Sequence, residues 1–203
     1  MKYQEWTFMD KAAWGPGPWQ NEPDKILWID QATGLPCMIR RGSPHIGVLC
    51  GYVGITESHP LFGNTNESWE LLSVHGGISY SDYCQEEAGE HGICHVPEPG
   101  EPDHVFWFGF DCGHAWDFMP AMMEVRSLMA RGREGETYED DGAYEIAQLE
   151  LGQTYRTIDY VRRWCECLAR QLHNLDPTKV PLPEDYLDAG AGGDATSDAE
   201  MKQ

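Results

Sequence analysis

Four potential metal ligands follow an apolar, strand-like run near the middle of the chain. The run FWFGF is followed within seven positions by Asp111, Cys112, His114 and Asp117. If the strand ends near Asp111 and the chain turns through Gly113, then Asp111, His114 and Asp117 recur every three residues. Their side chains then share one face of a helical turn. Because carboxylate oxygen and imidazole nitrogen suit Zn²⁺, Mn²⁺ or Fe²⁺, this spacing predicts a divalent-metal site, with zinc or manganese as the favoured ion.

His75 is the expected fourth ligand. It lies in SVHGG, where two glycines allow a sharp turn and the close approach of a ligand. An ion held by such groups retains a water whose pKa it lowers toward neutral. The alternatives are a hydrogen-bonded histidine beside a tight turn and, for Asp117, a capping role at a helix that begins near Pro120.

Two histidines are candidates for general acid–base catalysis. They are His75 and His59, and His59 precedes a proline in TESHPLFG. An imidazole titrates near neutral pH, as a proton-transfer group must. The alternative for His59 is a surface-loop histidine without a catalytic role.

A second constellation combines cysteine with histidine. Its members are Cys84, Cys94, His95 and Cys112, with His91 nearby. This donor set suits a tetrahedral structural zinc site that would fix the long loop over 81–103. The spacing is not that of a standard zinc motif, and buried free thiols are the alternative. Because neighbouring strand residues face opposite ways, a zinc ion at Cys112 would lie behind the strand from a site at Asp111.

Phosphate and redox motifs are sparse. Arg40 and Arg41 are adjacent in CMIRRG and offer a local cationic patch, although a solvated hairpin end is an equal alternative. Cys165 and Cys167, in WCEC, face away from each other on a helix and do not form a redox pair. The sequence contains no P-loop, dinucleotide-binding glycine fingerprint or nucleophile elbow.

Charge narrows the range of partners. The 203 residues include 14 Lys plus Arg against 34 Asp plus Glu, a formal net charge of −20. Such a field repels polyanions, so non-specific binding to nucleic acid or anionic membranes is not expected. The first residues lack the apolar core of a signal peptide, and no apolar run is long enough to span a membrane. We therefore expect a cytoplasmic protein with reduced cysteines.

The elements that position these residues indicate an α+β domain. Residues 25–42 read as a hairpin that turns at Gly34, a third apolar run follows over 44–56, and the aromatic run reads as a central strand. A shorter helix is expected after Pro120. The clearest element is a long amphipathic C-terminal helix that ends at Asn174, with a stripe formed by Ile158, Val161, Cys165, Leu168 and Leu172.

The expected architecture is a mainly antiparallel sheet with long loops, on which the C-terminal helix packs. Residues 1–176 form one globular domain in this interpretation. Residues 177–203 are rich in acidic and small side chains and poor in large apolar ones, so they predict a flexible acidic tail.

Four stretches carry a resemblance to other proteins. They are GYVGITESHPLFG, SVHGGISYSDYC, ICHVPEPGEPDHVFWFGFDCGHAWD and YRTIDYVRRWCECLARQL. This series, with VHGG followed by GFDCxHxxD, resembles a family of small hypothetical proteins from phages and bacterial genomes over about residues 44–172. The family brings no assigned activity and no site residues. It implies a phage or prophage origin, hence the cytoplasm of a bacterial host, where small acidic proteins often blunt host defence.

The metal cluster favours a metal-dependent hydrolase that acts on a phosphoester or nucleotide-like small molecule. In this hypothesis the ion is held by His75, Asp111, His114 and Asp117, and His59 or a bound hydroxide handles the proton. The alternative is a non-enzymatic protein that sequesters a signalling nucleotide or occupies a host protein as an acidic mimic.

Overall fold

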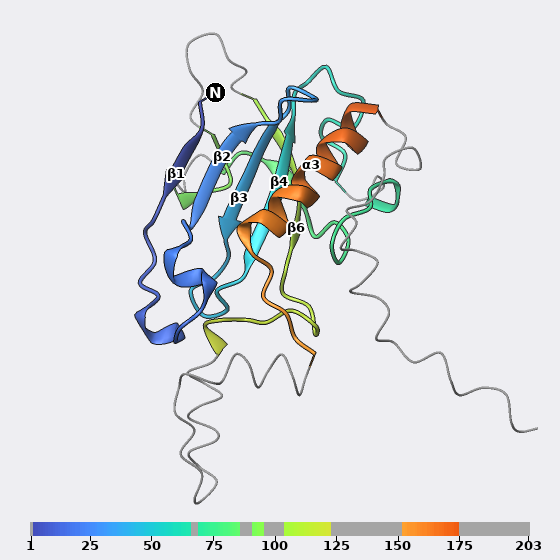
Figure 1. Ribbon diagram of the computed structural model, residues 1–203. Helices are drawn as coiled ribbons and strands as arrows, with labels where there is room; N and C mark the ends of the chain where they lie inside the picture. Colours follow the sequence, from blue (N-terminus) through green and yellow to red (C-terminus); the bar gives the residue numbers. More distant parts are fainter. Residues whose placement is uncertain (1, 66–68, 86–90, 96–103, 123–151, 175–203) are drawn as a thin grey trace, which may run out of the picture.

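A computed structural model describes residues 2–65, 69–85, 91–95, 104–122 and 152–174 of the chain. Within these ranges the chain forms a six-stranded antiparallel sheet and one long helix, α3 (Ile158–Asn174), which lies across one face of the sheet (Figure 1). The predicted α+β class with a mainly antiparallel sheet is confirmed. The helix expected after Pro120 and the expected acidic tail lie mainly or wholly outside the described residues.

The sheet has the strand order β1-β2-β3-β4-β6-β5. The strands are β1 (Gln4–Trp6), β2 (Lys25–Ile29), β3 (Pro36–Arg41), β4 (Leu49–Ile55), β5 (Tyr80–Tyr83) and β6 (Phe106–Asp111). Three short 3-10 helices lie between them: η1 (Ala12–Trp14), η2 (Pro18–Asn21) and η3 (Trp69–Leu71). Consecutive strands β2, β3 and β4 form the meander expected from the sequence. Strand β1 was not expected, because its three residues carry no alternating pattern.

The hairpin between β2 and β3 follows from its turn residues. The Asp30 carboxylate accepts hydrogen bonds from the amide and hydroxyl of Thr33, and Gly34 takes a φ of 75° that favours glycine. Strand β6 lies between β4 and β5, as expected of a run that is apolar on both faces.

The two faces of β6 belong to different cores. Phe106, Phe108 and Phe110 point to the face covered by α3, where the stripe of the helix packs. Trp107 points to the other face, in a smaller cluster with residues of the loop over 91–95. Helix and sheet approach closely at Gly51 of β4, where an added Cβ would lie 2.7 Å from the Cys165 sulfur. The alternation along β6 therefore decides on which side of the sheet each later side chain lies.

A buried ionic network ties the N-terminal segment to the sheet. Arg41 and Asp24 are fully buried, and the Arg41 Nε donates to Asp24 Oδ1 at 3.0 Å. Lys11 Nζ lies 2.7 Å from the same oxygen, and Arg41 Nη2 lies 3.1 Å from Glu22. Arg40 and Arg41 therefore do not form the cationic patch that was the predicted phosphate contact. Arg41 is paired with carboxylates inside the protein, and Arg40 donates to the main-chain carbonyl of His91.

Candidate metal centre

Three of the predicted ligands come together beside the start of α3. His75 lies in the turn before β5, and His114 and Asp117 lie in the loop after β6. One ligand atom from each of these residues lies within 4.8 Å of the other two. Residues separated by up to 42 positions thus form one group because β5 and β6 are paired strands.

Asp117 is the centre of this group. Its Oδ2 accepts a hydrogen bond from the His114 amide at 3.1 Å and lies 2.8 Å from His75 Nε2 and 3.2 Å from His114 Nδ1. The carboxylate is fully buried. Burial by itself raises the pKa of Asp117, but hydrogen bonds from His75 and Arg156 outweigh it and hold that pKa below its usual range. Asp117 is consequently an anion in a buried setting.

Two residues of the C-terminal segment orient this group from behind. The Tyr160 hydroxyl lies 2.9 Å from His75 Nδ1, and Arg156 Nε donates to Asp117 Oδ1 at 2.8 Å. The Arg156 guanidinium also lies over the Tyr160 ring, 4.8 Å from its centroid. Tyr160 thus fixes the ring nitrogen of His75 that points away from the group, and Arg156 fixes the corresponding oxygen of Asp117. Hydrogen bonds of this kind orient the ligands in metal sites.

Sequence reasoning missed Tyr160 and Arg156. Arg156 lies just before the predicted helix and Tyr160 lies in its first turn. Their partners, Asp117 and His75, are 39 and 85 positions away in the sequence. Tyr160 offered a weak signal in the sequence, since it is an aromatic residue with a hydroxyl in the first turn of the predicted amphipathic helix.

His114 is the ligand nearest to solvent. Its side chain is 25% exposed, whereas His75 and Asp117 are buried. Its ring stacks on that of Trp116, which is 49% exposed, with ring centroids 5.4 Å apart. His114 is therefore the member of the group through which solvent comes nearest.

The distances fit a metal after a small adjustment. Nitrogen and oxygen ligands of a tetrahedral zinc ion lie about 3.3 Å apart. The contacts of Asp117 Oδ2 with the rings of His75 and His114, at 2.8 and 3.2 Å, have the lengths of hydrogen bonds. Binding a cation would remove a ring proton and widen the shorter contact by about half an ångström.

Asp111 does not join this group. Its carboxylate accepts a hydrogen bond from the Gly113 amide at 2.9 Å and lies near Cys50. Asp111 is the last residue of β6 and faces the same side as Trp107, whereas Cys112 is buried on the side of α3. The predicted helical turn begins only at His114, so alternation along the strand, and not a three-residue period, decides where Asp111 points.

His59 does not join it either. Its Nδ1 accepts the Leu61 amide hydrogen, and its Nε2 lies 2.9 Å from the Leu172 carbonyl. Leu172 is twelve residues beyond Tyr160, which is about 18 Å along the helix. Both ring nitrogens thus contact the main chain, one in the loop of His59 itself and the other at the far end of α3.

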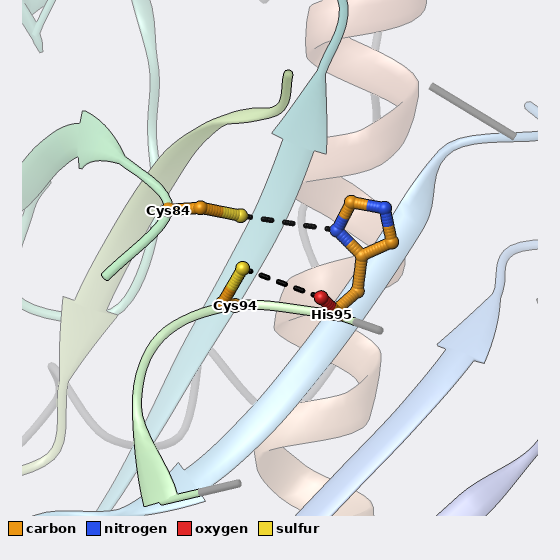
Figure 2. Close-up of side chains that lie close together, drawn as sticks. All are labelled: Cys84, Cys94 and His95. Atoms are coloured by element: carbon orange, nitrogen blue, oxygen red, sulfur yellow. Dashed lines mark hydrogen bonds between the residues drawn. The ribbon is translucent and has the colours of Figure 1, made fainter. Parts of the chain in front are cut away.

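A second group of possible ligands lies on the opposite face of the sheet (Figure 2). It contains Cys84, Cys94 and His95, whose ligand atoms also lie within 4.8 Å of one another. Cys112, the fourth member of the predicted zinc set, is buried in the core beneath α3 instead. The sheet therefore separates Cys112 from the other three residues.

Gly76 makes room for His114. Its φ is 67°, and an added Cβ would overlap the His114 ring. We expect Gly76→Ala to displace that ring and to lower the affinity for zinc or manganese by on the order of 10–100-fold. Titration calorimetry measures this change.

Gly77→Ala is the matched control for this prediction. Gly77 has a φ of 93°, so alanine there carries a similar backbone cost of about 1–2 kcal/mol, but an added Cβ meets no atom within 4 Å. Equal metal affinities in the two variants would contradict the role given to the His114 ring.

The chain matches no family model, no curated protein and no solved structure. Among the described residues, no helix has both the length and the apolar character needed to cross a membrane. Inference about function therefore depends on the geometry of the two groups.

Proposed function

We propose that the chain is a metal-dependent hydrolase whose ion is bound by His75 Nε2, His114 Nδ1 and Asp117 Oδ2. The observation that carries this proposal is the convergence of three ligand atoms from two loops, one of them from the partly exposed His114. Hydrogen bonds to Tyr160 and Arg156 give the site the outer support that metal ligands require. Three protein ligands plus a water are the usual composition of a catalytic zinc site.

The ion would supply the nucleophile. Three protein ligands leave a position for water, whose pKa the ion lowers toward neutral, so that a hydroxide forms at ordinary pH. No separate base is then required, and His59 has no part in the mechanism. For His75 to bind through Nε2, its proton must move to Nδ1, where the Tyr160 oxygen can accept the hydrogen bond.

A phosphoester or nucleotide-like small molecule is the proposed substrate. A chain of net charge −20 repels a free phosphate, and the buried Arg41 offers it no cationic contact. A divalent ion would provide that positive charge at the point of reaction. The exposed ring of Trp116 adds an aromatic surface beside His114, of the kind on which a base stacks.

Hydrolysis by metal-stripped and reloaded protein tests the proposal. We expect Zn²⁺ or Mn²⁺ to restore cleavage of bis(p-nitrophenyl) phosphate and a chelator to abolish it. His114→Ala should lower the rate by on the order of 100-fold or more, because it removes a ligand. His45→Ala, which removes an exposed loop histidine, should leave the rate unchanged. A rate that does not respond to chelation or to His114→Ala would refute a metal-dependent hydrolase.

A non-enzymatic role is the second candidate, and the net charge of −20 favours it. In this case the chain, as a phage-type protein, would sequester a signalling nucleotide or occupy a host protein through its acidic surface. The wild-type protein would then hydrolyse nothing, and its binding would weaken steeply with added salt.

A further inference from the structure

We infer that Cys84, Cys94 and His95 form a second metal site, specific for a thiolate-binding ion such as Zn²⁺, which fastens the loop over 91–95 to the sheet. This site is independent of the proposed hydrolytic centre. It lies on the face of the sheet opposite α3 (Figure 2). His75 and Asp117 lie beside the start of that helix.

The three ligand atoms lie close enough together to share one ion. Cys84 Sγ lies 3.8 Å from His95 Nδ1, and Cys94 Sγ lies within 4.8 Å of both. Sulfur at about 2.3 Å and nitrogen at about 2.1 Å from a tetrahedral zinc ion are about 3.6 Å apart. The contact between Cys84 and His95 is therefore close to the separation of two ligands of one zinc ion.

A hydrogen-bond donor lies beside the first sulfur. The Trp107 indole donates a hydrogen bond to Cys84 Sγ at 3.4 Å. Such a donor favours the charged form of a sulfur, and a thiolate is the form that binds metal. Cys94 Sγ donates to the His95 carbonyl at 3.3 Å, so binding an ion would remove the proton of that thiol.

A buried lysine positions the second sulfur. Lys25 of β2 is 2% exposed, and its Nζ donates to the carbonyls of Gly92 and Cys94 at 3.0 and 3.1 Å. The Gln85 amide donates to the Ile93 carbonyl at 3.1 Å and joins the end of β5 to the same loop. The main chain that carries the ligands is thus held from two strands.

The donor set selects the ion. Two soft sulfurs and one imidazole prefer zinc to manganese, magnesium or calcium, which take oxygen ligands. Two thiolates also balance the charge of a divalent ion, so the complex has no net charge in this partly buried group. Among the residues that the structure describes, no further histidine, cysteine or carboxylate joins the three. The fourth position would therefore belong to water or to an external ligand.

Cobalt titration of the reduced, metal-free protein tests this site. Co²⁺ bound to thiolate gives a strong near-ultraviolet charge-transfer absorption, which carboxylate and imidazole ligands do not give. We expect one equivalent of Co²⁺ to produce this band, Zn²⁺ to remove it, and Cys84→Ser, Cys94→Ser and His95→Gln to weaken or abolish it. Cys50→Ser is the matched control, because Cys50 is a half-buried cysteine on the same face and outside the group.

A second measurement does not depend on folding of the variants. In the wild-type protein, zinc should protect two thiols from a thiol reagent and a chelator should expose them again.

His114→Ala should keep the cobalt band while losing hydrolysis, so failure of one site is distinguishable from failure of the other. No charge-transfer band in folded wild-type protein, or an unchanged band in Cys84→Ser and Cys94→Ser, overturns the inference.

Discussion

Asp24→Ala is expected to lower the free energy of unfolding by about 3–5 kcal/mol, because it leaves buried cations without their shared anion. Asp24 lies within 3.0 Å of Arg41 Nε and 2.7 Å of Lys11 Nζ. Its second oxygen also accepts the amide hydrogens of Phe8 and Met9, both at 2.8 Å. Denaturant unfolding measures the loss.

The control for Asp24 is an acidic residue without such contacts. Glu57→Ala removes an exposed carboxylate and should change the free energy of unfolding by no more than about 0.5 kcal/mol. If Asp24→Ala is as stable as Glu57→Ala, the ionic network contributes nothing to stability.

Asp24 also makes the free energy of unfolding depend on pH. Burial raises the pKa of Asp24, but hydrogen bonds from Lys11 and the amides of Met9 and Phe8 outweigh it, so the folded pKa lies below the usual value. The folded state then binds this proton more weakly than the unfolded chain. Its contribution is complete above about pH 4 and is lost as pH falls further. Asp24→Ala should accordingly show a shallower loss of stability below about pH 4 than the wild type.

Local patterns were sufficient to predict the sheet and the long helix. The stripe from Ile158 to Leu172 faces the core, because apolar residues that repeat with a helical period over four turns can be buried together only on one side of a helix. The predicted last residue, Asn174, is also the last residue of α3. The hairpin turn at Gly34 is equally local. Strand β1 was missed because its three residues are held by pairing with β2, which is a long-range contact.

The candidate site was predictable only in part. His75, His114 and Asp117 were found because their residue types and flanking glycines indicate chemistry, and these three meet in the structure. The end of β6 at Asp111 was predicted correctly, but the turn begins at His114 and not at Asp111, so Asp111 follows the alternation of the strand and faces away from the other three residues. Tyr160 could not be assigned because its contact with His75 requires the tertiary fold.

Asp117→Asn should lower the affinity for zinc or manganese by on the order of 100-fold or more and destabilise the metal-free protein as well. The Asp117 carboxylate lies within hydrogen-bond distance of His75 Nε2 and His114 Nδ1 and accepts from Arg156 Nε. An asparagine has only one acceptor oxygen, so its amide hydrogens would face another N–H donor. Loss of a charged, buried partner of this kind costs about 3 kcal/mol or more.

Asp111→Asn is the matched control, because Asp111 is a carboxylate in the same segment whose described contact is the Gly113 amide. It should bind zinc or manganese as the wild type does. Unchanged affinity in both variants would mean that the ion is held elsewhere than at Asp117.

Stability and metal affinity together separate two roles of Asp117. A polar network that only joins the turn at His75, the loop at His114 and the start of α3 would lose stability in Asp117→Asn, yet wild-type protein would gain none from manganese, which the thiolate group on the other face of the sheet does not favour. A metal site at Asp117 requires that manganese stabilise the wild type in proportion to its concentration. It also requires that this gain disappear in Asp117→Asn and persist in Asp111→Asn, which a structural role for the carboxylate does not produce.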